Sequence, residues 1–203
     1  MTASARSGWP DIWFLRHGQT EWNAQGRIQG HLDSPLTALG QRQARMQAGN
    51  AAGVLNEIAA GGGGIHVSPL GRARQTAEIA LPGQPITIDA RLSEVAAGAW
   101  EGQLKADLPQ RKTDLLTYTS APDGETLEQL IARVEDFANS LDAPAIVVGH
   151  GLWGQVLRGL VKGLSPEEMG MQENAQGCIY HLSQGRETRL TAGDARGIDA
   201  SGA

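Results

Sequence analysis

The chain has 203 residues, of which 40% are hydrophobic and 19% are charged, and its formal net charge is −5. A chain of this length suits a single α/β domain with a substantial core better than two independent domains. The composition is that of a soluble globular protein, and the negative net charge argues against general nucleic-acid binding. A local basic pocket would therefore be needed to attract an anionic ligand.

Cysteine content and hydropathy restrict the cellular compartment. The single cysteine, Cys178, cannot form an internal disulfide or a thiolate zinc site, which favours a reducing environment. No apolar run approaches the roughly 20 residues that cross a bilayer, and the segment 1–9 lacks the apolar core of a signal peptide. We therefore predict a cytoplasmic protein that does not associate with membranes.

Segments typical of strands and helices alternate along the chain. The apolar run 12–15 predicts a buried strand, and the Ala/Gln/Arg-rich stretch 37–60 predicts a long helix. Apolar residues recur at helical spacing in 125–141, which predicts an amphipathic helix with a core-facing side. The other predicted elements are a strand at 65–67, a turn and helix at 68–80, a strand at 86–88, a buried strand at 145–148, a helix at 152–161 and a last strand at 178–182. This order predicts βαβ units.

Some segments fall outside this pattern. The ends, 1–7 and 193–203, are small, polar and rich in Gly and Ala, so we expect them to be flexible. The four glycines at 61–64 lack the Lys-Ser/Thr of a phosphate-binding P-loop, and we interpret them as a connector. The irregular stretch 96–124 mixes Gly, Pro and charge, and we expect it to form a small cap within a single domain, 1–203.

The tripeptide Arg16-His17-Gly18 directly follows the first predicted strand. Ligands of open α/β sheets bind at the carboxyl ends of the strands, and the planar fork of an arginine matches two phosphate oxygens. Gly18 is expected to permit a sharp turn that brings backbone N–H groups close to a ligand. His17 can act as a nucleophile or proton carrier, although a structural histidine is the commoner explanation of this tripeptide taken alone.

Three further residues follow predicted strands, and they favour a catalytic His17 over a structural one. His150 comes after the strand 145–148, Arg72 lies in the first turn after the strand 65–67, and Glu94 follows the strand 86–88. In a parallel sheet the carboxyl ends of the strands share one edge, so these side chains can face one crevice. A cation in the first turn of a helix opposes the helix dipole, which modestly favours a bound anion near Arg72.

The remaining histidines carry weaker signals. His31 follows a turn and reads equally well as a rim residue or a solvated loop residue, whereas His66 and His181 lie in predicted strands and are interpreted as structural. None of them has the spacing of a metal site, so no metal ligands are predicted.

A longer series of motifs resembles the histidine phosphatase superfamily, in its phosphoglycerate-mutase-like branch. The series runs in order from about residue 12 to about residue 182 and consists of Leu15-Arg16-His17-Gly18 with Glu21-Trp22-Asn23, Arg27 to Gly30, Asp33 to Thr37 with Gly40, Ser68 to Ala77, Leu92-Ser93-Glu94, Gly98 to Gly102, Pro122 to Thr126 and Gly149-His150-Gly151. The resemblance implies a three-layer α/β/α sandwich with a mostly parallel central sheet. It also suggests a homodimer, although no stripe in the sequence identifies an interface.

The resemblance implies a role for each site residue. His17 would take the phosphoryl group as a phosphohistidine, with Arg16, Arg72 and His150 around its oxygens. Glu94 would protonate the leaving oxygen and then activate the water that releases phosphate. The residues implied to bind substrate are Gln19, Thr20, Asn23, Gly151 and Lys105. No metal and no cofactor is implied for hydrolysis, and the partner would be a small phosphorylated metabolite.

The family contains phosphatases and mutases, which differ in whether the phosphohistidine meets water. The pattern Gly98-Ala99-Trp100-Glu101-Gly102 resembles the phosphatase members, and dedicated mutases carry a tyrosine where Ala97 stands. Lys105, by contrast, stands where mutases have a substrate-binding lysine. The sequence therefore favours a metal-independent phosphomonoesterase. The alternatives are a phosphoglycerate mutase, which would use 2,3-bisphosphoglycerate, and a catalytically weak protein that binds a phosphorylated ligand.

Overall fold

The computed structural model describes residues 8–191, and the predicted flexible ends lie outside this range. Six strands form one sheet in the order β3-β2-β4-β1-β5-β6. The strands β3 (Thr87–Ile88), β2 (Gly64–Val67), β4 (Ala145–Gly149) and β1 (Ile12–Arg16) pair in parallel, whereas β5 (Ile179–Ser183) pairs antiparallel with both β1 and β6 (Arg186–Leu190). The sheet is therefore mostly parallel, which confirms the fold that the resemblance implied.

Helices occupy the connections between the strands. The α-helices of the described residues are α1 (Glu21–Gln25), α2 (Ala38–Ala60), α3 (Gly71–Ala80), α4 (Asp114–Tyr118), α5 (Leu127–Asn139), α6 (Gly151–Lys162) and α7 (Pro166–Met171). Short 3-10 turns lie at Ala90–Leu92, Gly98–Trp100 and Lys105–Asp107. No helix in residues 8–191 has the length and hydropathy needed to cross a membrane.

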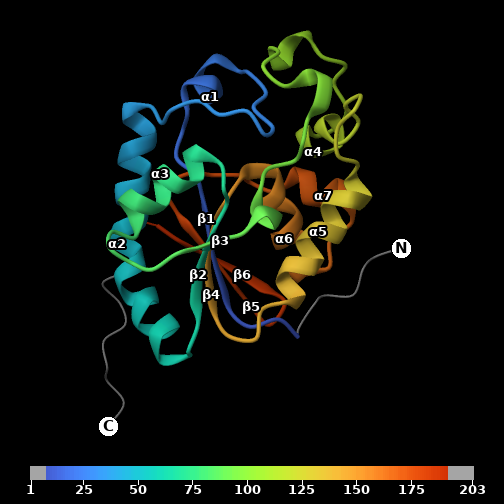
Figure 1. Ribbon diagram of the computed structural model, residues 1–203. Coiled ribbons are helices and arrows are strands. Elements are labelled where there is room, and N and C mark those ends of the chain that lie inside the picture. Colours follow the sequence, from blue (N-terminus) through green and yellow to red (C-terminus); the bar gives the residue numbers. More distant parts are fainter. Residues whose placement is uncertain (1–7, 192–203) are drawn as a thin grey trace.

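Helices cover both faces of the sheet because its central strands are apolar on both faces (Figure 1). In β1, Phe14 packs into a buried cluster with side chains of α5 and α6, whereas Leu15 packs with those of α2 and α3. Val147 and Val148 of β4 divide between the same two clusters. The result is the three-layer sandwich predicted above, with one core on each side of the sheet.

The two ends of the irregular stretch 96–124 lie next to each other, and we call this stretch the excursion. At its base, Glu125 N donates to Ala96 O at 2.8 Å, and Ala99 N donates to Pro122 O at 3.0 Å. Gly98 has a φ of 47°, and a Cβ there would lie 2.2 Å from Pro122 O, so a side chain at this position would prevent the base from closing. Figure 1 shows α4, from this excursion, and α1 at the same end of the sheet.

Candidate active site

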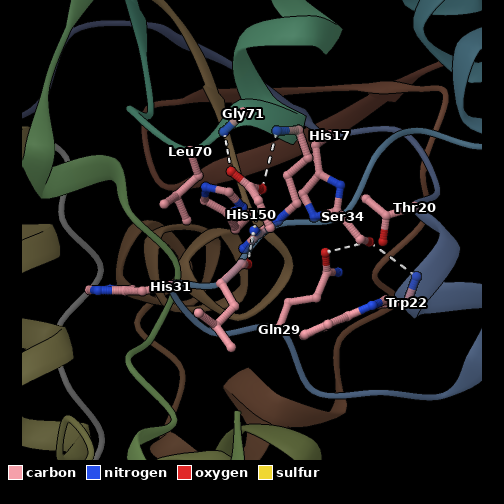
Figure 2. Close-up of polar contacts among 12 residues, drawn as sticks. His17, Thr20, Trp22, Gln29, His31, Ser34, Leu70, Gly71 and His150 are labelled. Atoms are coloured by element: carbon pink, nitrogen blue, oxygen red, sulfur yellow. Dashed lines mark hydrogen bonds and ion pairs between the residues drawn. The ribbon is translucent and has the colours of Figure 1, made fainter. Parts of the chain in front are cut away.

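Three neighbouring strands bring the predicted site residues together. β4 pairs with β1 on one side and β2 on the other, so the residues that follow these strands lie at one edge of the sheet. His17 N donates to Gly149 O at 3.0 Å, and Ser68 N donates to Val148 O at 3.0 Å. The rings of His17 and His150 lie 5.2 Å apart between centroids, and Figure 2 shows the two side chains next to each other. The two histidines thus lie side by side at the carboxyl ends of neighbouring strands, and their part in binding a ligand stays a prediction.

The His17 ring is buried and held in one tautomer. Its Nδ1 lies 2.7 Å from Gly18 O, and because a carbonyl only accepts, Nδ1 carries the proton and Nε2 has the free lone pair. Burial lowers the pKa of His17 well below its ordinary value, and the charges of Arg72 and Arg16 lower it further. His17 is therefore a neutral imidazole whose Nε2 has no hydrogen-bond partner among the described residues.

Gly18 has a different role from the one expected. Its N–H donates to Thr76 Oγ1 at 3.1 Å and so is directed at helix α3 instead of at a ligand. A Cβ at this position would lie 2.3 Å from the backbone oxygen of Gly40. Gly18 is thus required because two backbone segments approach closely, and the expectation that its turn presents N–H groups to a ligand is wrong.

His150 is fully buried and its Nε2 lies 2.7 Å from the Ser68 hydroxyl. Burial lowers its pKa well below the ordinary value, and the charges of Arg72, His17 and Arg16 act in the same direction. His150 is consequently neutral, so it can offer a hydrogen bond but not a full charge. The cationic character of the crevice comes from the arginines.

Arg72 is the second residue of helix α3, and its side chain is 1% exposed. Its Nη1 donates to Asp33 Oδ1 and to Leu32 O, and its Nη2 donates to Gly30 O, each at 2.8 Å. Asp33 also accepts from the backbone N–H groups of Gly71 and Arg72 (Figure 2 shows Gly71). The anion that the helix dipole argument called for is therefore the Asp33 carboxylate, and that argument no longer supports a bound ligand.

The side chain of Arg16 is bonded to the loop 172–177, which precedes β5. Its Nη1 donates to Asn174 O, and Gln47 Nε2 of α2 donates to the backbone oxygen of Arg16 at 2.9 Å. Gln176 Nε2 from the same loop donates to His17 O at 2.9 Å. These contacts fix the backbone of the Arg-His pair between α2 and the loop 172–177.

Three buried nitrogens in the crevice lack a hydrogen-bond partner among the described residues. They are Nε of Arg16, Nε of Arg72 and Nδ1 of His150. Buried polar atoms are normally paired, so an unpaired group needs an explanation. These atoms come from the three residues predicted to surround the phosphoryl group, and the two guanidinium N–H groups are the kind of donor that phosphate oxygens accept.

Glu94 is half-buried and its carboxylate lies at the N-terminus of α6. Oε1 accepts from Val95 N and Trp153 N, each at 3.0 Å, and Oε2 accepts from Leu152 N at 3.1 Å. A carboxylate oxygen can accept two hydrogen bonds, so Oε2 keeps one lone pair free. Burial lowers the pKa of both Arg16 and Arg72, and the nearby Glu94 charge opposes that shift in each.

The predicted substrate-binding residues divide into several groups. Thr20 and Asn23 form a capping box at the start of α1, where each side chain accepts from the backbone N–H of the other. Gln19 Oε1 accepts from the Thr37 hydroxyl at 2.9 Å. Thr20, Asn23 and Gln19 thus hold the loop after His17 in shape, and their contact with a substrate stays a prediction.

Gly151 and Lys105 lie in very different surroundings. Gly151 is the first residue of α6. A Cβ there would lie 2.8 Å from Asn174 Nδ2 and 3.2 Å from Arg16 Nε, so only a residue without a side chain leaves room for the Arg16 guanidinium. Lys105 lies in the excursion and forms an ion pair with Asp114 at 2.6 Å. Its predicted part in substrate binding also stays untested by these contacts.

The other histidines separate into one rim residue and two structural residues. His31 Nε2 lies 2.9 Å from the backbone oxygen of Glu94, so the ring reaches the rim (Figure 2 labels it). His66 packs edge-on against Phe137, and His181 stacks on Trp13 and contacts Asp11, which confirms their structural interpretation. No group of three or more His, Cys, Asp or Glu side chains in residues 8–191 is arranged to hold a metal ion.

Several residues of the site were not singled out by the sequence patterns. Ser68 and Asp33 lie within motifs of the resemblance, but nothing in their spacing shows that one contacts His150 and the other Arg72. Gln176 and Asn174 come from the loop 172–177, which has no periodicity and no motif. Their partners are more than 150 residues away in the chain, so only the folded structure reveals these contacts.

Known proteins resemble the chain over most of its length. Residues 12–192 match the family model of the histidine phosphatase superfamily (branch 1). A Salmonella arizonae protein named "Probable phosphoglycerate mutase GpmB" is 37% identical over 213 aligned positions, which cover 93% of this chain and 95% of the relative. The protein of the same name from Citrobacter koseri is 40% identical over 157 positions, which cover 70% and 69% of the two chains.

Solved structures share the architecture. A Thermus thermophilus protein named TTHB049 superposes with a TM-score of 0.72 at 31% identity, covering 89% of this chain and 99% of that one. A structure from Escherichia coli named "putative alpha-ribazole-5'-P phosphatase" gives a TM-score of 0.73 at 26% identity, covering 95% and 100%. The span matched by the family model includes every residue of the crevice described above. The chain therefore belongs to branch 1 of the histidine phosphatase superfamily.

Proposed function

We propose that the protein hydrolyses the phosphate ester of a small phosphorylated metabolite through a phosphohistidine on His17. The observation that carries this proposal is the neutral His17 ring, which lies near enough to Arg16 and Arg72 to feel their charges, while each of these arginines has an unpaired, buried Nε. Phosphoryl transfer depends mainly on positioning and on stabilising negative charge. Two guanidinium groups and a neutral nucleophile supply both.

In the first half-reaction, the Nε2 lone pair of His17 attacks phosphorus and the bond from phosphorus to the leaving oxygen breaks. Glu94 in its protonated form gives its proton to that oxygen, so an alcohol leaves and Glu94 becomes a carboxylate. The Nδ1–H bond to Gly18 O stays intact and stabilises the positive charge that develops on the ring. Arg16, Arg72 and His150 bind the phosphoryl oxygens during the transfer.

In the second half-reaction, a water molecule replaces the departed alcohol. The Glu94 carboxylate takes a proton from this water while its oxygen attacks phosphorus, and the bond from phosphorus to Nε2 breaks. Inorganic phosphate is released, His17 returns to the neutral state, and Glu94 is protonated again. Atoms and charges therefore balance over the cycle without a cofactor.

We also propose that hydrolysis needs no metal ion, because the arginines provide the positive charge that a metal would otherwise supply. Treatment with EDTA should leave kcat/KM for an aryl phosphate unchanged. Loss of activity that is restored by one divalent cation would contradict this part of the proposal.

The nucleophile is tested with His17→Ala and the matched control His181→Ala. His181 is a half-buried imidazole bonded to a neighbour, but it lies in β5 outside the crevice. The His17 variant should lose release of phosphate from 4-nitrophenyl phosphate and should not become labelled by a phosphorylated substrate, whereas the control should retain both. Appreciable turnover by the His17 variant would show that another group attacks.

A mutase is the second candidate, and the names of the Salmonella and Citrobacter relatives favour it. The buried Ala97, where dedicated mutases carry a tyrosine, and the pairing of Lys105 with Asp114 favour the phosphatase. A mutase would interconvert 3- and 2-phosphoglycerate and respond to 2,3-bisphosphoglycerate. A coupled assay that detects this interconversion at a rate above hydrolysis would replace our proposal with the mutase.

A further inference from the structure

A half-buried ion pair contacts the backbone of the segment that carries Glu94. Arg133 of α5 donates from Nε and Nη2 to the carboxylate of Glu125, at 2.8 and 2.6 Å. The remaining donors of the same guanidinium bind the backbone: Nη1 donates to Arg91 O and Ser93 O, each at 2.7 Å, and Nη2 points to Glu94 O at 3.4 Å. One side chain thus binds three carbonyls within four consecutive residues that end at Glu94.

The partner Glu125 ties the same segment from its other side. Glu125 Oε2 accepts from Ala96 N at 3.4 Å, and the Glu125 backbone N–H donates to Ala96 O. The Glu125–Arg133 pair, which we call the clamp, therefore holds the chain both before and after Glu94. It also holds the base of the excursion 96–124.

The backbone that the clamp holds determines where the Glu94 carboxylate lies. Arg91 O, which accepts from Arg133, also accepts from Trp153 Nε1 at 2.8 Å, and the Trp153 backbone N–H donates to Glu94 Oε1. The segment 91–94 and the first turn of α6 are thus joined at two points by hydrogen bonds. A shift of this backbone would carry the carboxylate away from the Leu152 and Trp153 amides and from the crevice.

We propose that Arg133 is a positioning residue for the proton transfers of Glu94. The proposal rests on the proposed hydrolysis and adds a residue that does not touch the substrate. Among the described residues, Arg133 donates hydrogen bonds only to the backbone near Glu94 and to the Glu125 carboxylate, so it acts on Glu94 through geometry. Its charge also lowers the pKa of His150, although less than the charges of Arg72, His17 and Arg16 do. An arginine suits this place because its five N–H donors in one plane bind a carboxylate and carbonyls together, which a lysine ammonium cannot reproduce.

Arg91 provides a matched control on the same segment. Its guanidinium also forms ion pairs with two carboxylates, those of Asp89 and Asp136, but it points away from Glu94 and binds no carbonyl of the segment 91–94 among the described residues. Arg91→Gln therefore removes a guanidinium and its ion pairs while it leaves in place the hydrogen bonds from Arg133 to the backbone of the segment 91–94.

The test uses aryl phosphates whose leaving groups differ in pKa. A good leaving group such as 4-nitrophenol needs little help from an acid, whereas phenol depends on proton donation from Glu94. In Arg133→Gln, kcat/KM should fall by less than about 3-fold for 4-nitrophenyl phosphate and by about 10-fold or more for phenyl phosphate. Glu94→Gln should likewise lose more activity on phenyl phosphate than on 4-nitrophenyl phosphate. Arg91→Gln should leave the ratio of the two substrates unchanged.

Equal losses on both substrates would mean that Arg133 supports only the fold and would overturn the proposal. If Arg133→Gln does not fold, Arg133→Lys and Glu125→Gln provide the same comparison with smaller perturbations.

If the wild-type protein hydrolyses no aryl phosphate, the proposed function fails, and a measurement independent of activity decides the role of Arg133. Amide hydrogen exchange at Leu152 and Trp153 should accelerate at least about 10-fold in Arg133→Gln but not in Arg91→Gln, and unchanged exchange in both variants would overturn the proposal.

Discussion

In His150, a hydrogen bond at one ring nitrogen determines whether the other ring nitrogen carries a proton. Its Nε2 contacts the buried Ser68 hydroxyl, and its Nδ1 is unpaired among the described residues. If the hydroxyl donates to Nε2, then Nδ1 carries the proton and can donate to a phosphoryl oxygen. We therefore expect Ser68 to set the tautomer of a neutral His150.

Ser68→Ala should therefore weaken catalysis without removing any group that touches the substrate. Loss of one hydrogen bond is worth about 0.5–1.5 kcal/mol, so we expect kcat/KM to fall roughly 2- to 12-fold. Nitrogen chemical shifts of the imidazole should report a mixture of tautomers of His150 in this variant. Ser34→Ala, which removes another buried hydroxyl bonded to Gln29, is the control and should leave the His150 tautomer as it is.

At the scale of elements, two helices begin at an acidic side chain that comes from elsewhere in the chain. Asp33 accepts from the first amides of α3, and Glu94 accepts from those of α6. Neither helix has a side-chain cap from its own N-cap residue, Leu70 or His150. The two carboxylates thus satisfy the amides at the N-termini of α3 and α6. Asp33 also holds Arg72 in place, and Glu94 is the proton donor of the mechanism that we propose.

Asp33→Asn should lower the free energy of unfolding by about 1 kcal/mol or more, because two interactions are lost. They are the charge that complements the N-terminus of α3 and the ion pair with the Arg72 guanidinium, whose side chain is 1% exposed. The control is Asp136→Asn, which removes an exposed carboxylate near the C-terminus of α5, where a negative charge gives the dipole no stabilisation. Urea denaturation of both variants measures the difference, and equal losses would contradict the role of Asp33.

Periodicity in the sequence was a good guide to the long elements and a poor guide to the short ones. The helices predicted at 37–60 and 125–141 correspond to α2 and α5, with α5 two residues shorter at each end. The short helices α1, α4 and α7 were not predicted as helices, because five or six residues are too few to show a helical period. The edge strand β6 was also missed, since its sequence, Arg186 to Leu190, is mostly polar.

At the scale of the whole molecule, strand order decides which residues meet. The sequence predicted correctly that residues after several strands converge, because parallel strands place their carboxyl ends at one edge. It could not show that β4 lies between β1 and β2, and this order is what puts His150 beside both His17 and Ser68. The clamp on Glu94 and the loop 172–177 were equally inaccessible, since they depend on contacts between distant segments.

The buried histidines make the stability of the whole fold depend on pH in a defined direction. His17 and His150 have folded-state pKa values well below the ordinary value of about 6.5, because they are buried beside arginines. Below pH 6.5 these two imidazoles bind protons in the unfolded chain but stay neutral in the folded chain. The free energy of unfolding therefore falls as the pH falls. Above pH 6.5 both states carry neutral imidazoles, and these residues then contribute no pH dependence.

Between pH 6.5 and 5.5 the two histidines together should reduce the free energy of unfolding by up to about 2 kcal/mol, or about 1 kcal/mol each, because an imidazole of the unfolded chain is already half protonated at pH 6.5. Urea denaturation across this interval should show a decline that is much flatter in the double variant His17→Gln/His150→Gln. Val134→Ala, a core truncation without a titrating group, should lower stability equally at every pH and so keep the wild-type slope. A double variant with the wild-type slope would mean that the two imidazoles take up protons in the folded protein as readily as in water, which would remove the basis for a neutral His17 nucleophile.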